Sequence, residues 1–266
     1  MKKLLLFFVI VSLCYQCKEK PKEKEELLVL AQGEINWKPA QDYYLKHITN
    51  AFELLDELDS LPMTGQPTQE AFTEIRTAFK KAETYASYLN PEIGHRANGP
   101  ALPIVTDDTQ RTLLPLGLQK LEESIYEGEE TEVRYREEIN MMRGLLRNLQ
   151  DNVRKRELTP QRFFIATHQQ LMRIVSLGIS GFDTPVSQLG LKETIVSLES
   201  LRDVYRMTLQ EEINQKNSGL DETLLKNIEA AVDFIRSNMD FESFDRYSFI
   251  KDYMNPITRK EQTYQF

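Results

Sequence analysis

Apolar residues recur every three or four positions along most of this chain, which is the period of an α-helix with one buried face. Proline and glycine divide the pattern into segments, and none shows the strict alternation typical of a β-strand. In the clearest segment the apolar residues are Phe72, Ile75, Phe79, Ala82, Ala86 and Leu89. The pattern therefore predicts an all-α protein.

The expected helix boundaries follow from the prolines. A proline is favoured in the first turn of a helix, and the residue before a proline is usually extended, which ends a helix. Thr159 and Asp221 are the expected N-caps of two of the helices. The helices are expected at about residues 39–58, 72–89, 116–126, 129–156, 161–179, 186–213, 221–239 and 244–254. Short turns between them indicate an antiparallel helical bundle, either one bundle or two packed side by side.

The 129–156 segment is highly charged, and the glutamates of residues 127–138 are expected to form a solvated face. Its inward-facing residues are expected to be Val133, Ile139, Met142, Leu146 and Leu149.

Residues 91–115 are predicted to form a long loop, and loops of this length are usually functional or packed against the body of a domain. Polar side chains of the two neighbouring helices are expected to pin it through buried hydrogen bonds, because buried polar groups need partners. The candidates for pinning or binding are Arg76, Glu83, His95, Asn98, Gln119 and Glu122. His95 lies within the loop and is the best-placed histidine for function, whereas His47 and His168 are expected to be structural helical residues.

The N-terminus has the features of an export signal. Lys2 and Lys3 precede an apolar run of ten residues, Leu4–Leu13, which is too short to span a bilayer as a helix. Residues 1–16 are therefore interpreted as a signal peptide, and residues 17–33 as a charged, solvated tether. Cys17, at the junction, resembles a bacterial lipoprotein processing site. Cys14 is the alternative acceptor, and secretion without a lipid is the alternative fate.

The composition excludes several classes of function. The formal net charge is −8, which disfavours nucleic acid as a partner. Both cysteines lie in the first 17 residues, so the body can carry neither a disulfide nor a Cys-x-x-Cys-His haem site. The sequence also lacks a Gly-x-Ser-x-Gly elbow, a phosphate-binding glycine loop and the paired Glu-x-x-His motifs of di-metal bundles. We therefore expect no catalytic residue and no metal site in this chain.

Several short blocks, in one order over about residues 40–258, resemble the N-terminal helical region of bacterial periplasmic di-haem cytochrome c peroxidases. These blocks are Phe79–Glu83, Asn98–Pro103, Pro115–Glu123, Gly181–Pro185, Phe244–Arg246, Phe249–Ile250 and Asn255–Thr258. The resemblance implies a helical domain over residues 34–258. Residues 259–266 would then be a C-terminal tail, ending close to where the haem-bearing part of a peroxidase begins, as in a truncated or split member.

That peroxidase region is in turn similar to the imelysin-like fold, whose hallmark is Gly-x-His-x-x-Glu on a helix. The equivalent positions here are Gly117, Gln119 and Glu122, so glutamine replaces the histidine. A glutamine amide is a poor substitute for imidazole as a zinc or iron ligand. The substitution argues against an imelysin-type metallopeptidase.

The resemblance implies a non-catalytic interaction or scaffold module, exported to the periplasm or outer membrane and held to the membrane by a lipid. Haem is expected only on a partner or on a missing C-terminal part. The expected partner is a di-haem peroxidase core or another periplasmic electron-transfer protein. The alternative is a stand-alone imelysin-like lipoprotein that binds iron or haem for uptake.

Overall fold

The computed structural model describes residues 28–29, 35–105, 112–261 and 264–265. The predicted signal peptide, Cys14 and Cys17 lie outside these residues, as does most of the predicted tether. Among the described helices, none combines the length and apolar character that crossing a bilayer requires.

The protein is all-α, as the apolar periodicity predicts. Its helices are α2 Lys38–Ser60, α3 Gln66–Leu89, α4 Pro91–Asn98, α5 Leu118–Glu127, α6 Glu132–Lys155, α7 Pro160–Arg173, α8 Gly190–Thr208, α9 Gln210–Lys216, α10 Ser218–Ser237, α11 Arg246–Ser248 and α12 Asn255–Glu261. Two π-helical segments continue α7 and α11, namely η1 Ile174–Gly178 and η2 Phe249–Met254.

Two pairs of two-residue strands accompany the helices, although the sequence pattern predicts none. β1 Leu28–Val29 pairs in parallel with β4 Tyr264–Gln265, and β2 Ile104–Val105 pairs antiparallel with β3 Thr112–Leu113. Strands this short leave no room for an alternating pattern, which is why the periodicity does not reveal them.

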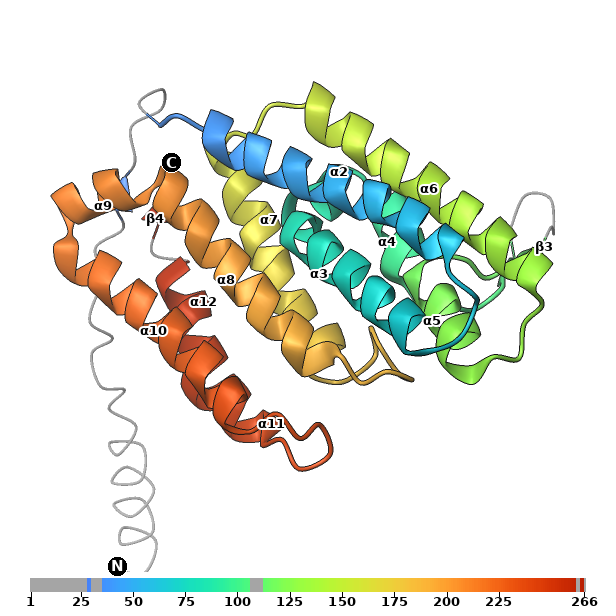
Figure 1. Ribbon diagram of the computed structural model, residues 1–266. Helices are drawn as coiled ribbons and strands as arrows, with labels where there is room; N and C mark the ends of the chain where they lie inside the picture. The colour runs from blue at the N-terminus through green and yellow to red at the C-terminus, as the bar shows by residue number, and fades with distance from the viewer. Residues whose placement is uncertain (1–27, 30–34, 106–111, 262–263, 266) are drawn as a thin grey trace, which may run out of the picture.

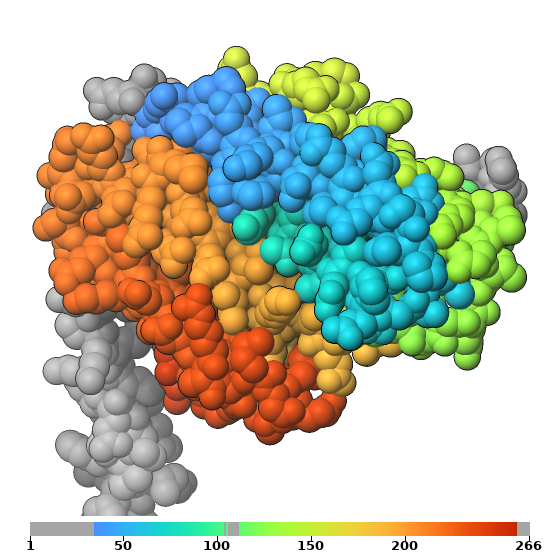
Figure 2. All heavy atoms as spheres, viewed as in Figure 1, coloured from blue at the N-terminus to red at the C-terminus, as the bar shows by residue number. Residues whose placement is uncertain are grey.

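Helix α3 lies at the centre of the fold, where it packs against α2, α4, α5, α6, α7 and α8. Helices α2 to α6 gather on one side of the molecule, and the chain from α7 to α12 forms the other side (Figure 1). In Figure 2 the surface of α2, in blue, runs into that of α6, in yellow-green, and that of α8, in orange. From Ile75 to Leu89, most residues of α3 are buried.

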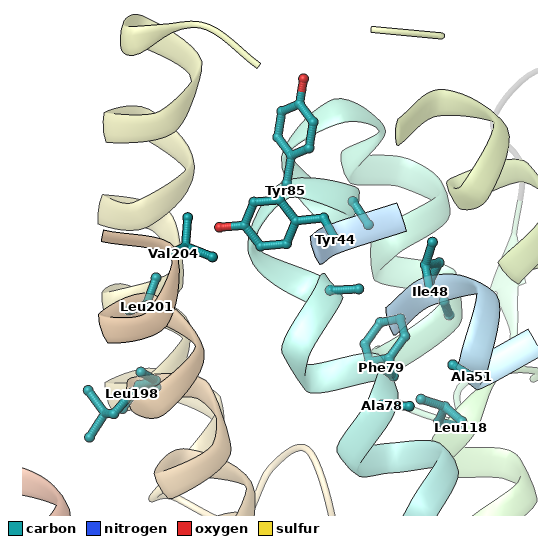
Figure 3. Packing of buried hydrophobic residues seen from close by; sticks show 14 of the residues in the cluster. Tyr44, Ile48, Ala51, Ala78, Phe79, Tyr85, Leu118, Leu198, Leu201 and Val204 are labelled. Carbon is teal, nitrogen blue, oxygen red and sulfur yellow. The ribbon is translucent and has the colours of Figure 1, made fainter. Parts of the chain in front are cut away.

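The apolar core is continuous around α3. Tyr44 of α2 lies beside Tyr85 of α3, with ring centroids 5.6 Å apart, and Ile48 of α2, Phe79 of α3 and Leu118 of α5 belong to the same buried cluster (Figure 3). Each of the five side chains is at most 1% exposed, and burying one contributes about 1.5–3 kcal/mol. This packing fixes α3, and with it every polar side chain that α3 carries.

One helix lies where the sequence predicts only loop. Asn90-Pro91 was expected to end a helix, and it does end α3, but it also starts α4. The Asn90 side chain accepts a hydrogen bond from the Ile93 amide, and Pro91 occupies the first turn, where its missing N–H costs nothing. The expectation of a loop from residue 91 was therefore wrong for Pro91–Asn98.

Three other boundaries differ from the expected ones. The helix predicted over 186–213 starts at Gly190 and is divided at Leu209 into α8 and α9. Asn217, rather than Asp221, caps α10, because its side chain accepts from the Leu220 amide. The helical chain also continues past Asn255-Pro256 into α12, since Pro256 falls in that helix's first turn.

The inward face of α6 is offset from the expected one at its start. Val133 is 72% exposed, whereas Glu138 is fully buried and accepts a hydrogen bond from the Ser124 hydroxyl at 2.8 Å. Tyr135 takes the first inward position of the helix in place of Val133. Glu138 is thus an exception to the solvated acidic face that the sequence predicts.

Candidate functional site

Three charged residues of α3 are buried at the centre of the molecule. Arg76, Lys80 and Glu83 follow one another at spacings of four and three residues, so they lie along one helix face. Each is at most 3% exposed. The apolar stripe of α3 packs against α2, and the surrounding helices cover this charged face as well.

Arg76 binds Glu193 of α8 in a bidentate ion pair, with Nε–Oε1 and Nη2–Oε2 distances of 2.5 and 2.7 Å. Its Nη1 donates to Asn98 Oδ1 at the end of α4, at 2.7 Å. The guanidinium therefore joins α3 to both α8 and α4, in the planar geometry that suits arginine and carboxylate.

Lys80 and Glu83 extend the network. The Lys80 ammonium donates to Asp183 Oδ2 at 2.5 Å and to Glu83 Oε2 at 3.1 Å. Glu83 also accepts from Asn98 Nδ2 at 3.0 Å and from Gln170 Nε2 of α7 at 2.9 Å. Both Glu83 oxygens are therefore fully engaged.

Asp183 differs from Glu83 in its partners. Its Oδ1 is buried and has no hydrogen-bond partner within the described residues. Burial raises the pKa of Asp183, and Lys80 offsets only part of this effect. Burial would also raise the pKa of Glu83, but Lys80, Arg173 and the Gln170 amide overcome it and lower that pKa to about 2.

The segment between η1 and α8 carries Asp183 and is anchored to α5. Gln119 Nε2 donates to the Phe182 carbonyl at 2.6 Å, and Glu122 Oε1 accepts from the Ser187 amide at 2.7 Å and its hydroxyl at 2.5 Å. Gly181 lies within this connector, residues 179–189, with a φ of +80°, and Phe241 occupies the space that a side chain would need there.

The structure thus brings together five of the six sequence-predicted site residues, although their contacts differ from those expected. Arg76 and Glu83 do hold Asn98, at the end of α4. Gln119 and Glu122 instead contact the connector 179–189, which sequence patterning placed partly inside a helix.

His95, the sixth predicted residue, is exposed on α4 and lines a cavity of about 250 Å³ next to the network. Glu83, Asp183 and Arg173 line the same cavity. The remaining lining residues are Ser87, Pro91, Gly94, Asn98, Gly99, Pro100, Leu177 and Phe182. Pockets of this mixed lining, polar on one part and apolar on another, are the usual form of small-molecule sites.

The other two histidines lie apart from this cavity. His47 of α2 stacks edge-on against Tyr43, with ring centroids 4.4 Å apart, and burial lowers its pKa to about 4. His168 lies on α7 and is half-buried.

The geometry at Gln119 and Glu122 does not fit a metal site. The Gln119 amide donates to a carbonyl, and one Glu122 oxygen is occupied by two bonds from Ser187. Over the described ranges, no cluster of three or more histidine, cysteine, aspartate or glutamate side chains could hold a metal ion.

Several members of the network were not predicted from the sequence, namely Lys80, Gln170, Arg173, Asp183 and Glu193. The charges at 76, 80 and 83 recur at helical spacing, and this signal could have marked a polar buried face of α3. Glu193 and Gln170 carry no such signal, because only the packing of α7 and α8 against α3 brings them to it.

No protein-family model matches the chain, and a search of curated proteins finds no significant match. The fold does match a solved structure, described as "putative iron-regulated protein A precursor" from Parabacteroides distasonis. The TM-score is 0.58 at 10% sequence identity, and the match covers 93% of this chain and 96% of the other. This likeness shows that the two proteins share an all-helical fold; it does not bear on the resemblance to di-haem peroxidases.

Proposed function

We propose that this protein is an exported binding protein of iron or haem acquisition, and that the cavity beside the Arg76–Lys80–Glu83 network is its ligand site. The observation that carries the proposal is the fold match, which extends over nearly all of both chains and involves a protein described as iron-regulated and as a precursor. The alternative raised by sequence analysis is thereby better supported than the peroxidase-module interpretation.

The construction of the cavity wall supports a binding role. Buried ion pairs contribute little net stability compared with an apolar core of the same volume. Here Lys80, Glu83 and Asp183 are at most 3% exposed, and Glu83 and Asp183 line the cavity. Side chains held by several partners are preorganised, which reduces the entropy lost when a ligand binds.

The membrane attachment that we propose is a lipid on Cys17, with the charged residues that follow acting as a tether. A single acyl chain binds membranes weakly, whereas the multiple chains of a processed lipoprotein cysteine would anchor the protein stably. The "precursor" in the description of the Parabacteroides protein agrees with export.

The proposal is tested by titrating the purified protein with ferric citrate, ferrioxamine B and haemin, followed by calorimetry and, for haemin, by absorbance. We expect saturable binding of at least one of these compounds at one site per chain. If all three fail to bind, the proposed function is wrong.

A second candidate is the interaction module for a di-haem peroxidase core. It is favoured by the fact that four of the blocks that resemble the peroxidase region contribute Lys80, Glu83, Asn98, Gln119, Glu122 and Asp183 to one site. Size-exclusion chromatography with a di-haem peroxidase core tests it. A stable complex would support the module, and independent elution would reject it.

A further inference from the structure

One residue of the cavity wall, Asp183, has a carboxylate oxygen that accepts no hydrogen bond from the described residues. Asp183 is 1% exposed and lines the cavity, and its Oδ1 has no partner in the described structure. A buried acceptor without a donor costs about 1–3 kcal/mol, and among the buried atoms in this state, which include Glu122 Oε2 and Glu138 Oε1, Asp183 Oδ1 belongs to a residue that lines the cavity. A ligand that brings a donor would remove this cost.

The charges around the cavity also fail to balance. Arg76 and Lys80 face three ion-paired carboxylates, those of Glu83, Asp183 and Glu193. Two further charged side chains lie close to these five. Arg173, which is positive, lines the cavity, and Glu122, which is negative, interacts with Arg76. With all of these groups ionised, the cluster carries one net negative charge.

Part of the cavity wall is apolar. Pro91 and Pro100 lie on the α4 side, and Leu177 of η1 and Phe182 of the connector lie on the other. Phe182 is 51% exposed, so its ring borders the cavity while remaining open to solvent. Such walls suit a hydrocarbon chain, and an aromatic ring also attracts a cation.

We propose that the cavity binds the protonated amine of an alkyl ammonium ligand, with the ammonium on Asp183 Oδ1 and its carbon chain against Phe182 and Leu177. This inference rests on the proposed function and names the ligand class for the same site: an iron complex would be held through an ammonium arm.

Among the described residues that line the cavity, Arg173 is the arginine or lysine side chain. Its Nη1 donates to Gln170 Oε1 at 3.2 Å, and its charge is partly neutralised by Glu83. The ammonium therefore belongs on the Asp183 side of the cavity, where the Lys80 ammonium already pairs with Oδ2.

The experiment compares two pairs of probes that differ only in charge. Butylammonium is compared with 1-butanol by NMR titration, and ferrioxamine B, which carries a free ammonium arm, with its N-acetylated form by calorimetry. A charge-assisted hydrogen bond is worth about 1.5–3 kcal/mol, so we expect each cation to bind at least about tenfold more tightly than its neutral counterpart.

Asp183→Asn should abolish that preference, while Asp233→Asn, an exposed residue of α10, should retain it. Phe182→Ala should weaken butylammonium binding several-fold, and its exposed position makes it a variant that folds. Equal binding of cation and neutral probe, or a preference that survives in Asp183→Asn, would overturn the inference.

The outcomes separate the two proposals. An iron compound that binds wild type and Asp183→Asn equally would leave the proposed function standing and overturn the ammonium site. A charge-selective response to butylammonium, with no binding of ferric citrate, ferrioxamine B or haemin, would support the ammonium site and reject the role in iron acquisition.

Discussion

The Lys80 ammonium donates to Asp183 Oδ2 at 2.5 Å, although the two residues are 103 positions apart in the sequence. This contact joins the central helix α3 to the connector between η1 and α8. Because both residues are buried, the pair places the connector, with Phe182, at the wall of the cavity. The ion pair therefore shapes the candidate site as well as contributing to its charge.

Breaking the buried arginine pair should be costly. Arg76→Met removes both hydrogen bonds of the buried Glu193 carboxylate to the guanidinium and leaves it only the longer, 3.8 Å contact with Lys80 Nζ, so we expect a loss of about 3–5 kcal/mol in the free energy of unfolding, measured by urea denaturation. The matched control is Arg236→Met, which removes an Arg–Glu pair of similar length, 2.6 Å to Glu199, at the surface. That change should cost at most about 1 kcal/mol. Equal losses in the two variants would contradict the account.

Gln119 should be needed to hold the connector in place. Gln119→Ala leaves the Phe182 carbonyl without its donor, and we expect a loss of about 1–3 kcal/mol and faster proteolysis within residues 181–188. Gln66→Ala, which removes only an exposed bond to Glu70, is the control. Unchanged cleavage and stability in Gln119→Ala would show that the connector does not depend on this bond.

The loss of folding stability at acidic pH should depend on Glu83. Its pKa falls from an ordinary 4.5 to about 2 in the folded protein, so its ionised form stabilises the fold above pH 4.5. That stabilisation is lost as the pH falls from 4.5 toward 2. Denaturation between pH 5 and pH 2.5 should therefore show a shallower pH dependence for Glu83→Gln than for wild type. Parallel curves would contradict the prediction.

The contribution of Glu122 to folding stability should depend on pH in the opposite direction. Burial raises its pKa, and the bonds from Ser187 offset only part of this rise, so its contribution is present at low pH and declines as the pH rises through the folded pKa. The stability of Glu122→Gln relative to wild type should increase from pH 4 to pH 7.5. Glu137→Gln, which changes an exposed residue of α6, should show no such trend.

Cys17→Ser should release the protein from membranes into the soluble fraction, because it removes the proposed lipid attachment. Cys14→Ser should remain in the membrane fraction. The reverse pattern, measured by fractionation and immunoblotting, would assign the lipid to Cys14.

The sequence was informative where a local pattern decides the structure. The spacing of Phe72, Ile75 and Phe79 predicts α3, and Thr159-Pro160 predicts the start of α7, where the Thr159 hydroxyl accepts from the Arg162 amide. At Asn90-Pro91 the sequence predicted a loop where α4 begins, because the same two residues suit the end of one helix and the start of the next. Local pattern alone cannot choose between these possibilities.

The candidate site was only partly predictable. Arg76, Glu83 and Asn98 attract attention as polar residues near a proline-rich segment, and they do contact one another. Glu193 and Gln170 reach the site only through the packing of α7 and α8 on α3, which no sequence periodicity records. The unpaired oxygen of Asp183 likewise depends on the fold of the connector.

Filling the cavity with a larger side chain is the most direct test of whether the cavity is the ligand site. Leu177→Trp places a larger side chain in the cavity wall, and Leu225→Trp makes the same change at a half-buried position on α10, away from it. Ferric citrate, ferrioxamine B and haemin are then titrated into wild type and both variants by calorimetry. The account predicts that at least one compound binds wild type and Leu225→Trp at one site per chain, with its affinity lowered at least about tenfold in Leu177→Trp. Binding that is equal in all three proteins would place the ligand elsewhere, and no binding to any of them would contradict the proposed function.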